Sequence, residues 1–375
     1  MSGLIVSRAR ISQLGRETSA ATQQGVPIVV AEVHGMHNKK QALSGWRLAG
    51  AGGLIGAAVG AASIRAATRM PGRSHQGSLP PLTPEEQELA IALRSDVETL
   101  AVGIGERHTL APDALMAAAG FLERSLIAAG CETRRQVFEA GGVECVNVES
   151  QISGAGLEEE IIVVGGHYDT IPGCPGANDN ASGAAATVAL ARAFANTRPA
   201  RTIRFVCFVN EEPPYFQTAA MGSRVYAREC RERGERIVGM LSLETMGCYS
   251  DLPGSQHYPL PTGWLYPSTG EFIAFVGNIA SGALTRSVVE RFRRLAHFPS
   301  EGAILPGAIT GLGWSDHWSF WQEGYPAIMV TDTAPFRYVY YHTPEDTPDK
   351  IDYERFARVV AGLQRVVAEM GGISK

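Results

Sequence analysis

The sequence predicts an α/β protein with a mixed, mostly parallel central sheet and helices on both faces. From about residue 84 onward, short apolar and β-branched segments alternate with longer helix-like segments. Such alternation is typical of sheets whose strands are joined through helices. In addition, 45% of the 375 residues are hydrophobic and 19% are charged, which is the composition of a globular protein with a sizeable core.

The elements of this fold can be placed along the chain. The first helix begins at "TPEE", where Thr83 is the expected N-cap, Pro84 occupies the first position and Glu86 closes a capping box. Helices are expected at residues 84–102, 112–129, 182–196, 222–233, 282–295 and 350–370. Strands are expected at residues 134–139, 143–150, 160–166, 202–209, 237–243, 271–277 and 326–331.

The chain before residue 83 differs in composition from the rest. Residues 1–78 carry nine Arg and Lys against two Glu, whereas the remainder is acidic. We expect a basic, disordered tail over residues 1–47, a candidate membrane anchor over 48–64, a Pro/Gly/Ser-rich linker over 65–82 and a catalytic domain over 83–375.

The candidate anchor is an uncharged stretch of 17 residues between basic flanks, which is close to the shortest length that spans a bilayer. Gly52, Gly56 and Gly60 fall on one helical face, as in helices that pack closely in membranes. An Ala/Gly-rich linker and the apolar core of a signal peptide are the alternatives. The excess of basic residues before the stretch favours a catalytic domain outside the cytoplasm, anchored or secreted. A cytoplasmic location stays open.

Overall charge and cysteine usage exclude some classes of function. The net charge of -5 gives no electrostatic case for a nucleic-acid partner. The six cysteines are scattered without a C-x-x-C pair, which argues against a zinc finger or a thioredoxin-like site. The disulfide state and the oligomeric state stay open.

Ionisable residues recur where predicted strands end, which is where ligands bind in open α/β sheets. The segments that carry them are "GGHYDT", "PGANDNASG", "NEEPP", "LSLETMG", "GWSDHWSF" and "YYHTPEDTPDK". Each has an ordinary interpretation when taken alone. For example, Asp179 could cap the helix that follows it, and Asp346 in "DTP" could cap the last helix. Together they indicate one shared site.

The residue types in these segments suit a two-zinc site, which needs about two His and three carboxylates. The set His167, Asp179, Glu212, Glu244 and His342 supplies them. Asp169, two residues after His167, suits the orientation of that imidazole. Because neighbours on a strand point in opposite directions, one of Glu211 and Glu212 can face a metal while the other faces water.

The ordered motifs over residues 84–371 closely resemble those of the zinc-dependent exopeptidases that include bacterial leucyl aminopeptidases and glutamate carboxypeptidase. The resemblance implies a zinc-dependent exopeptidase, most simply an aminopeptidase, that acts on a peptide or aminoacyl substrate with two zinc ions per chain. No protease-associated insert separates the motifs.

Specific roles follow from this resemblance. It implies that His167, Asp179 and Glu244 bind one zinc, with Asp179 bridging to a second zinc held by Glu212 and His342. Glu211 would be the general base, Asp169 the partner of His167, and Asp316 a hydrogen-bonding or substrate-positioning residue. Glu244 is a departure, since aminopeptidases of this family carry Asp there.

The segment from Tyr249 to Gly270 is long and rich in Pro, Gly and aromatic residues, so it is more than a plain connection. Its Tyr258, Trp264 and Tyr266 could line a pocket for an apolar side chain, or could only attach the loop to the body. Tyr215 and Phe216, next to the "NEEPP" segment, offer the same role.

Three other functions are compatible with parts of the sequence. A glutaminyl-peptide cyclotransferase-like zinc acyltransferase shares the architecture but uses a single metal. A non-catalytic binding ectodomain would lack ligands or the base, and none is missing here. A serine hydrolase with Ser315 as nucleophile is suggested by "GWSDH", but His317 stands where the G-x-S-x-G motif requires glycine.

Overall fold

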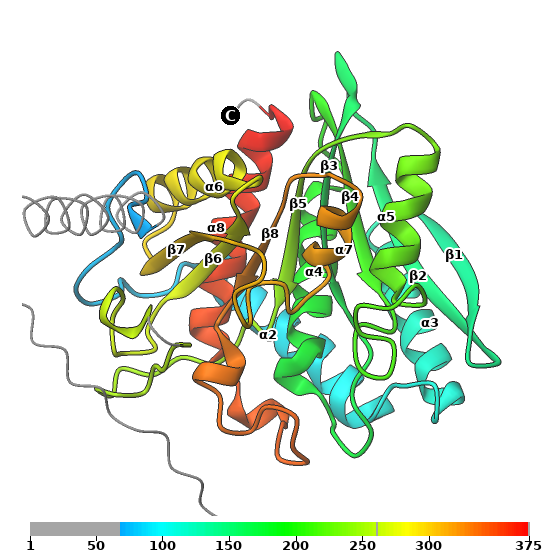
Figure 1. Cartoon of the computed structure of the whole chain (residues 1–375), viewed down its shortest axis with the longest axis horizontal. Coiled ribbons are helices and arrows are strands. Elements are labelled where there is room, and N and C mark those ends of the chain that lie inside the picture. Colours follow the sequence, from blue (N-terminus) through cyan, green and yellow to red (C-terminus); the bar gives the residue numbers. More distant parts are fainter. Residues whose placement is uncertain (1–67, 260–261, 374–375) are drawn as a thin grey trace, which may run out of the picture. The chain divides into compact units, whose positions relative to one another are not determined.

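An eight-stranded mixed sheet runs through the centre of the structure (Figure 1). Its strands are β1 (Glu132–Ala140), β2 (Val143–Ile152), β3 (Leu157–His167), β4 (Arg201–Phe208), β5 (Arg236–Glu244), β6 (Ile273–Asn278), β7 (Ser300–Leu305) and β8 (Ala327–Thr331). They lie in the order β1-β2-β4-β3-β5-β8-β6-β7. The pairs β3–β4, β3–β5, β5–β8 and β6–β7 are parallel and the other three are antiparallel. The predicted fold class is confirmed.

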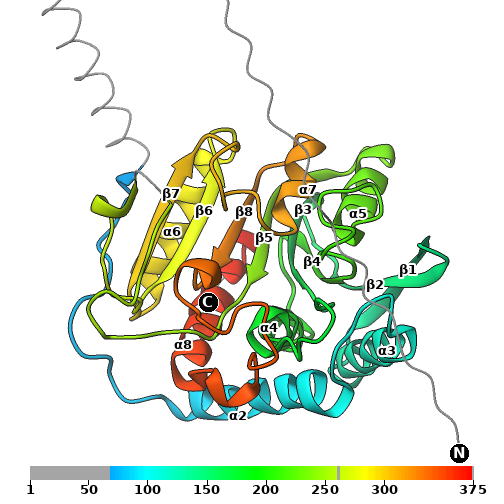
Figure 2. The same ribbon diagram turned by 60° about the horizontal axis from the view of Figure 1, so that its bottom comes forward.

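Helices cover the two faces of the sheet unequally (Figure 2). They are α2 (Pro84–Glu98), α3 (Pro112–Ala128), α4 (Ser182–Phe194), α5 (Gly222–Glu232), α6 (Gly282–Leu295), α7 (His317–Gln322) and α8 (Tyr353–Gly371). On one face α2, α3, α4, α6 and α8 pack around the larger of two buried clusters. On the other face α5 and α7 pack over β3, β4, β5 and β8. Loops line the surface of β6 and β7 on this second face.

The computed structural model describes residues 68–259 and 262–373, which belong to one compact unit. The predicted tail and the candidate anchor, residues 1–64, lie outside these ranges. A search of the described helices finds none that is long and apolar enough to cross a bilayer. The membrane anchor therefore stays a prediction.

The described part of the predicted linker is attached to the body, and we call residues 69–80 the N-terminal strap. The Arg293 guanidinium on α6 donates hydrogen bonds to the carbonyls of residues 70–72. The Ser300 amide at the start of β7 donates to the Ser74 hydroxyl at 2.8 Å. Met70 is 7% exposed and lies in the larger buried cluster. The ordered body thus begins before the capped start of α2.

One helix end and two short elements differ most from the sequence prediction. The capping box of Thr83 and Glu86 is present, but the α-helix ends at Glu98 and continues as a π-helical turn over Thr99–Ile104. The strand β7 was not predicted, because "SEGAIL" is short, pairs only with β6 and contains Ser, Glu and Gly. The helix α7 was not predicted either, because six residues are too few for a helical period.

Candidate metal centre

The predicted ligands meet at the carboxyl ends of the central strands, as expected for an α/β sheet. His167 and Glu244 are the last residues of β3 and β5. Glu211 and Glu212 follow β4, whose last residue is Phe208. The other two ligands lie in connections: Asp179 in the short segment η2 (Ala177–Ala181), and His342 between η4 (Ala334–Phe336) and η5 (Pro348–Lys350).

Two sets of ligand atoms form around Asp179. In the first set His167 Nε2 lies 3.3 Å from Asp179 Oδ1 and 3.4 Å from Glu244 Oε2. In the second set His342 Nε2 lies 3.0 Å from Asp179 Oδ2 and 3.1 Å from Glu212 Oε1. Within each set, one ligand atom per residue lies within 4.8 Å of the others. The two sets share Asp179, which presents a different oxygen to each.

Several observations indicate that a cation belongs here. Both ring nitrogens of His167 and Oδ2 of Asp179 are buried without a hydrogen-bond partner. Burial raises the pKa of Glu212 to about 7 and raises the pKa values of Glu211 and Glu244 above their usual range. So many buried carboxylates are costly unless positive charge compensates them. Imidazole nitrogen and carboxylate oxygen are ligands that zinc prefers. The residues therefore fit a zinc site.

Asp169 holds the glutamate pair in place. Its two carboxylate oxygens accept the amide protons of Glu211 and Glu212, each at 3.1 Å, and its Oδ1 lies 3.4 Å from His167 Nδ1. Asn210, just before the pair, has a φ of 59°. The pair therefore lies in a turn beyond the strand, and the expectation that strand alternation separates the two carboxylates is wrong. Instead Glu211 Oε2 lies 3.8 Å from His167 Nε2, whereas Glu212 contacts His342.

Ser315 supports Glu244. Its hydroxyl donates to Glu244 Oε2 at 2.7 Å and lies 2.7 Å from the Ser242 hydroxyl. The side chain of Glu244, at the position where the family resemblance implies Asp, thus reaches its ligand set and is fixed there. The neighbouring His317 pairs with the Leu312 carbonyl through Nε2 instead of with Ser315. A nucleophilic role for Ser315 is not supported, because its proton is directed at a carboxylate ligand.

Asp316 is fully buried, and neither of its carboxylate oxygens has a hydrogen-bond partner. Burial raises its pKa to about 7. It belongs to neither ligand set. Its predicted supporting role therefore stays a prediction.

Two further residues, Asp346 and Arg107, have supporting roles that the sequence analysis did not predict. Asp346 accepts the amide protons of Asn178 (2.8 Å) and Asp179 (3.1 Å) on its two oxygens. The alternative that it caps the last helix is wrong, since Asp352 accepts the Arg355 amide there. Arg107 is fully buried and donates to the carbonyls of Leu100, Gly105, Tyr168, Pro175 and Gly176. Both residues fix the backbone that presents Asp179.

Replacement of Asp346 by asparagine should weaken zinc binding by about 10- to 100-fold, the usual cost of losing a group that orients a metal ligand. The asparagine side chain has one oxygen and cannot accept both backbone protons, so the amide of Asn178 or that of Asp179 loses its partner. Zinc competition with a chromophoric chelator measures the effect. The matched control is Asp349→Asn, three residues further along the chain in η5, where the side chain is largely exposed. Equal affinities of both variants would contradict the role of Asp346.

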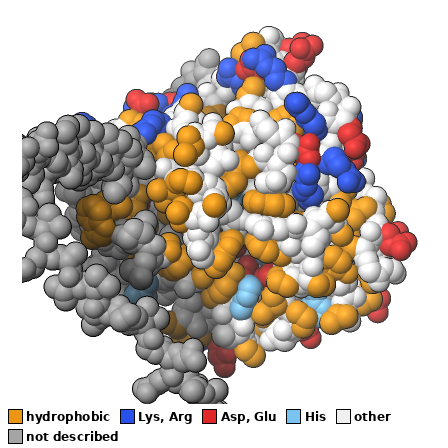
Figure 3. All heavy atoms as spheres, viewed as in Figure 1, with side chains coloured by type: hydrophobic (Ala, Val, Ile, Leu, Met, Phe, Trp, Pro, Cys, Tyr) orange, Lys and Arg blue, Asp and Glu red, His pale blue; other side chains and the backbone are white. Residues whose placement is uncertain are grey.

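A hollow with a mostly apolar lining opens beside the first ligand set, and Glu244 belongs to both. The lining includes Glu244, Thr245, Gln256, Tyr258, Tyr266, Ala274, Val276, Glu301, Ala303, Leu305, Trp314, Met329, Thr331, Thr333, Phe336 and Tyr341. Hydrophobic side chains gather on the face of the molecule that Figure 3 shows, around a few imidazole and acidic groups.

Some of the predicted substrate residues line this hollow and others do not. Tyr258 and Tyr266 line the hollow and stack with their ring centroids 5.6 Å apart. Trp264 is 72% exposed and lies outside the lining. Tyr215 lines a separate, smaller recess with Glu212, and Phe216 lines neither. Trp314, which the sequence analysis did not select, does line the hollow.

The two candidate ligand sets fit a zinc-dependent hydrolase. The model of peptidase family M28 matches residues 147–367. The chain belongs to this family and is a peptidase.

Relatives support this assignment. The "Uncharacterized protein YfbL" of Escherichia coli K12 is 36% identical over 260 residues, which cover 67% of this chain and 79% of that protein. A "Probable leucine aminopeptidase" of Arthroderma otae is 26% identical over 224 residues, 56% of this chain and 54% of the relative. This chain thus spans about half the length of that fungal relative.

Solved structures share the fold. The aminopeptidase from Aneurinibacillus sp. strain AM-1 matches with a TM-score of 0.58 at 17% identity, over 76% of this chain and 95% of that one. The glutaminyl cyclase of Porphyromonas gingivalis matches with a TM-score of 0.56 at 18% identity, over 75% and 98%. At such identities the likeness shows the fold alone.

Proposed function

We propose that the protein is a two-zinc exopeptidase, specifically an aminopeptidase. The observation that carries the proposal is the sharing of Asp179 by two ligand sets, one with His167 and Glu244 and the other with Glu212 and His342. A carboxylate that offers one oxygen to each of two cations is the bridging ligand that two-metal hydrolases use.

The residues around the centre have separable roles in amide hydrolysis. When bound, zinc lowers the pKa of coordinated water and polarises a carbonyl oxygen. Glu211 lies at the centre but in neither ligand set, so its carboxylate is free to take a proton from water and return it to the leaving amine. Asp169 fixes the main chain of Glu211 and faces His167 Nδ1. Ser315 and Asp346 fix Glu244 and the Asp179 peptide.

The glutaminyl-peptide cyclotransferase-like alternative shares the fold, as the similarity to glutaminyl cyclases indicates. A site for a single metal ion needs only one ligand set, and Asp179, Glu212 and His342 of the second set would be sufficient for it. The presence of His167 together with Glu244, and the support of Glu244 by Ser315, favour the peptidase.

Metal analysis of the purified, zinc-loaded protein should give two zinc ions per chain, and chelation should abolish hydrolysis of aminoacyl p-nitroanilides until zinc is restored. One zinc per chain, with cyclisation of N-terminal glutaminyl peptides, would favour the cyclotransferase instead. Activity that survives exhaustive chelation, with metal content near zero, would contradict a zinc mechanism. Blocked C-terminal peptides in the same assay test whether hydrolysis proceeds from the amino end.

A further inference from the structure

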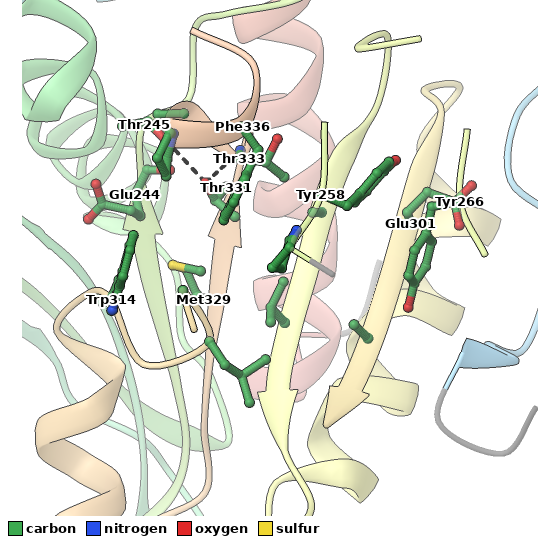
Figure 4. A pocket seen from close by; sticks show the side chains of 18 of the residues that line it. Glu244, Thr245, Tyr258, Tyr266, Glu301, Trp314, Met329, Thr331, Thr333 and Phe336 are labelled. Carbon is green, nitrogen blue, oxygen red and sulfur yellow. Dashed lines mark hydrogen bonds between the residues drawn. The ribbon is translucent and has the colours of Figure 1, made fainter. Parts of the chain in front are cut away.

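The floor of the apolar hollow is the bare sheet itself. Strand pairing aligns Glu244 of β5 with Thr331 of β8, then Ala274 of β6, then Glu301 of β7. A second row beside it contains Met329, Val276 and Ala303. Because paired residues point to the same face, these side chains form one continuous surface. Figure 4 shows Glu244 at one end of the hollow and Glu301 and Tyr266 at the other.

The length of this floor follows from the sheet. Glu244 and Glu301 are three strand spacings apart, which is about 14 Å at 4.7–4.9 Å per spacing. An extended hydrocarbon chain advances roughly 1.3 Å per carbon, given C–C bonds of about 1.5 Å. The floor therefore matches a chain of about ten or eleven carbons. A single leucine side chain would occupy only the part next to Glu244.

The hollow is unsuited to a peptide backbone, whose N–H and C=O groups each need a partner. Several of its polar side chains are already engaged with the protein. Thr245 Oγ1 lies 3.1 Å from Thr331 Oγ1, and Gln256 donates to Thr333 Oγ1 at 2.9 Å. The Tyr258 and Tyr266 hydroxyls donate to the Pro267 and Gly302 carbonyls. Backbone groups of β6 are also used, because both of its neighbours pair with it.

The far end of the hollow sets a limit. The carboxyl group of Glu301 lies there, 3.8 Å from the Arg293 guanidinium. A hydrocarbon chain that reached further would press against this ion pair, and desolvation of charged groups is unfavourable. Chains longer than the floor should therefore gain no further affinity.

From this geometry we propose that the hollow binds the hydrocarbon chain of an acyl group, and that the enzyme hydrolyses N-acyl amino acids with chains of about ten carbons. The inference rests on the proposed hydrolytic function, since it places the acyl carbonyl at the same centre. Water adds its oxygen to the acyl carbon, the amide C–N bond breaks, and a proton passes through Glu211 to the leaving nitrogen. The products are a fatty acid and a free amino acid.

The test is a chain-length series of N-acyl leucines, from acetyl to hexadecanoyl, on the zinc-loaded enzyme. We expect kcat/KM to rise by up to about fourfold per added carbon, the factor for burying one methylene, and to level off near ten to twelve carbons. A profile that is flat or falls from acetyl onward would overturn the proposal. Leucine p-nitroanilide serves as the parallel substrate for the proposed aminopeptidase.

Variants of the floor give a second readout. Ala303→Phe fills the hollow at β7. The kcat/KM for the decanoyl substrate, divided by that for the acetyl substrate, should therefore fall at least tenfold. Ala303→Leu is a smaller change and should lower the same ratio. The control is Ala155→Phe, at an exposed alanine in the turn between β2 and β3. An unchanged ratio in both Ala303 variants would place the chain elsewhere.

Binding can be measured without turnover, using decanoate and the fluorescence of the half-exposed Trp314 at the hollow. Saturable binding of decanoate but not of acetate, weakened by Ala303→Phe, supports the inference even if leucine p-nitroanilide is not cleaved. Cleavage of leucine p-nitroanilide without decanoate binding or acyl-leucine hydrolysis overturns the inference and leaves the proposed function in place.

Discussion

Replacement of Glu211 by glutamine is expected to lower kcat by roughly 10²–10⁴-fold, the range for losing general acid–base catalysis. Glutamine keeps the shape of the side chain but cannot accept a proton. Because Glu211 belongs to neither ligand set, the variant should retain both zinc ions. Steady-state kinetics on an aminoacyl p-nitroanilide and metal analysis of the same preparation measure the two effects.

The neighbouring Glu212→Gln variant is the matched control, since it makes the same change one residue away. Glu212 Oε1 lies with His342 in the second ligand set, so loss of its charge should reduce zinc content and thermal stability. Equal zinc loss in both variants would mean that Glu211 is also a ligand. The opposite pattern, in which Glu211→Gln loses zinc and Glu212→Gln keeps both zinc ions, would mean that Glu211 is the ligand and Glu212 the base.

Replacement of Asp179 by asparagine is expected to remove zinc from both positions and to abolish activity. Asparagine offers a single neutral carbonyl oxygen where the native residue gives one anionic oxygen to each set. By comparison, His167→Ala and His342→Ala each disrupt one set only. Metal analysis should therefore read close to zero for Asp179→Asn and close to one for each histidine variant. Circular dichroism checks that each variant is folded. Two retained zinc ions in Asp179→Asn would contradict the proposal that Asp179 is a ligand shared by both sets.

The sequence was sufficient to predict which residues form the two candidate ligand sets, because each stands at or just after a strand end or in a connection that returns to the same edge. His167 and Glu244 end β3 and β5, as a buried apolar run followed by a polar residue indicates. The capped start of α2 was predictable for a similar reason, since Thr83 and Glu86 contact each other within one turn.

Supporting residues were not predictable, because their partners are remote in sequence. Asp346 bonds to an amide 168 residues away, and Ser315 to a carboxylate 71 residues away. Arg107 carries no motif, and only the folded chain brings five carbonyl groups around it. The extent of the hollow was also beyond the sequence, since it depends on β7, an edge strand that has a weak apolar pattern.

The residues of the two ligand sets are spread along the described chain, from His167 at the end of β3 to His342, which precedes the last helix α8. During synthesis, a ribosome-bound chain that has produced His167 and Asp179 still lacks the second imidazole. Domains generally fold as units as they emerge. A growing chain therefore gains the last residue of its two ligand sets only after α7 and β8 have been made. A chain that ends between residues 244 and 342 therefore has one candidate ligand set complete and the other without its imidazole.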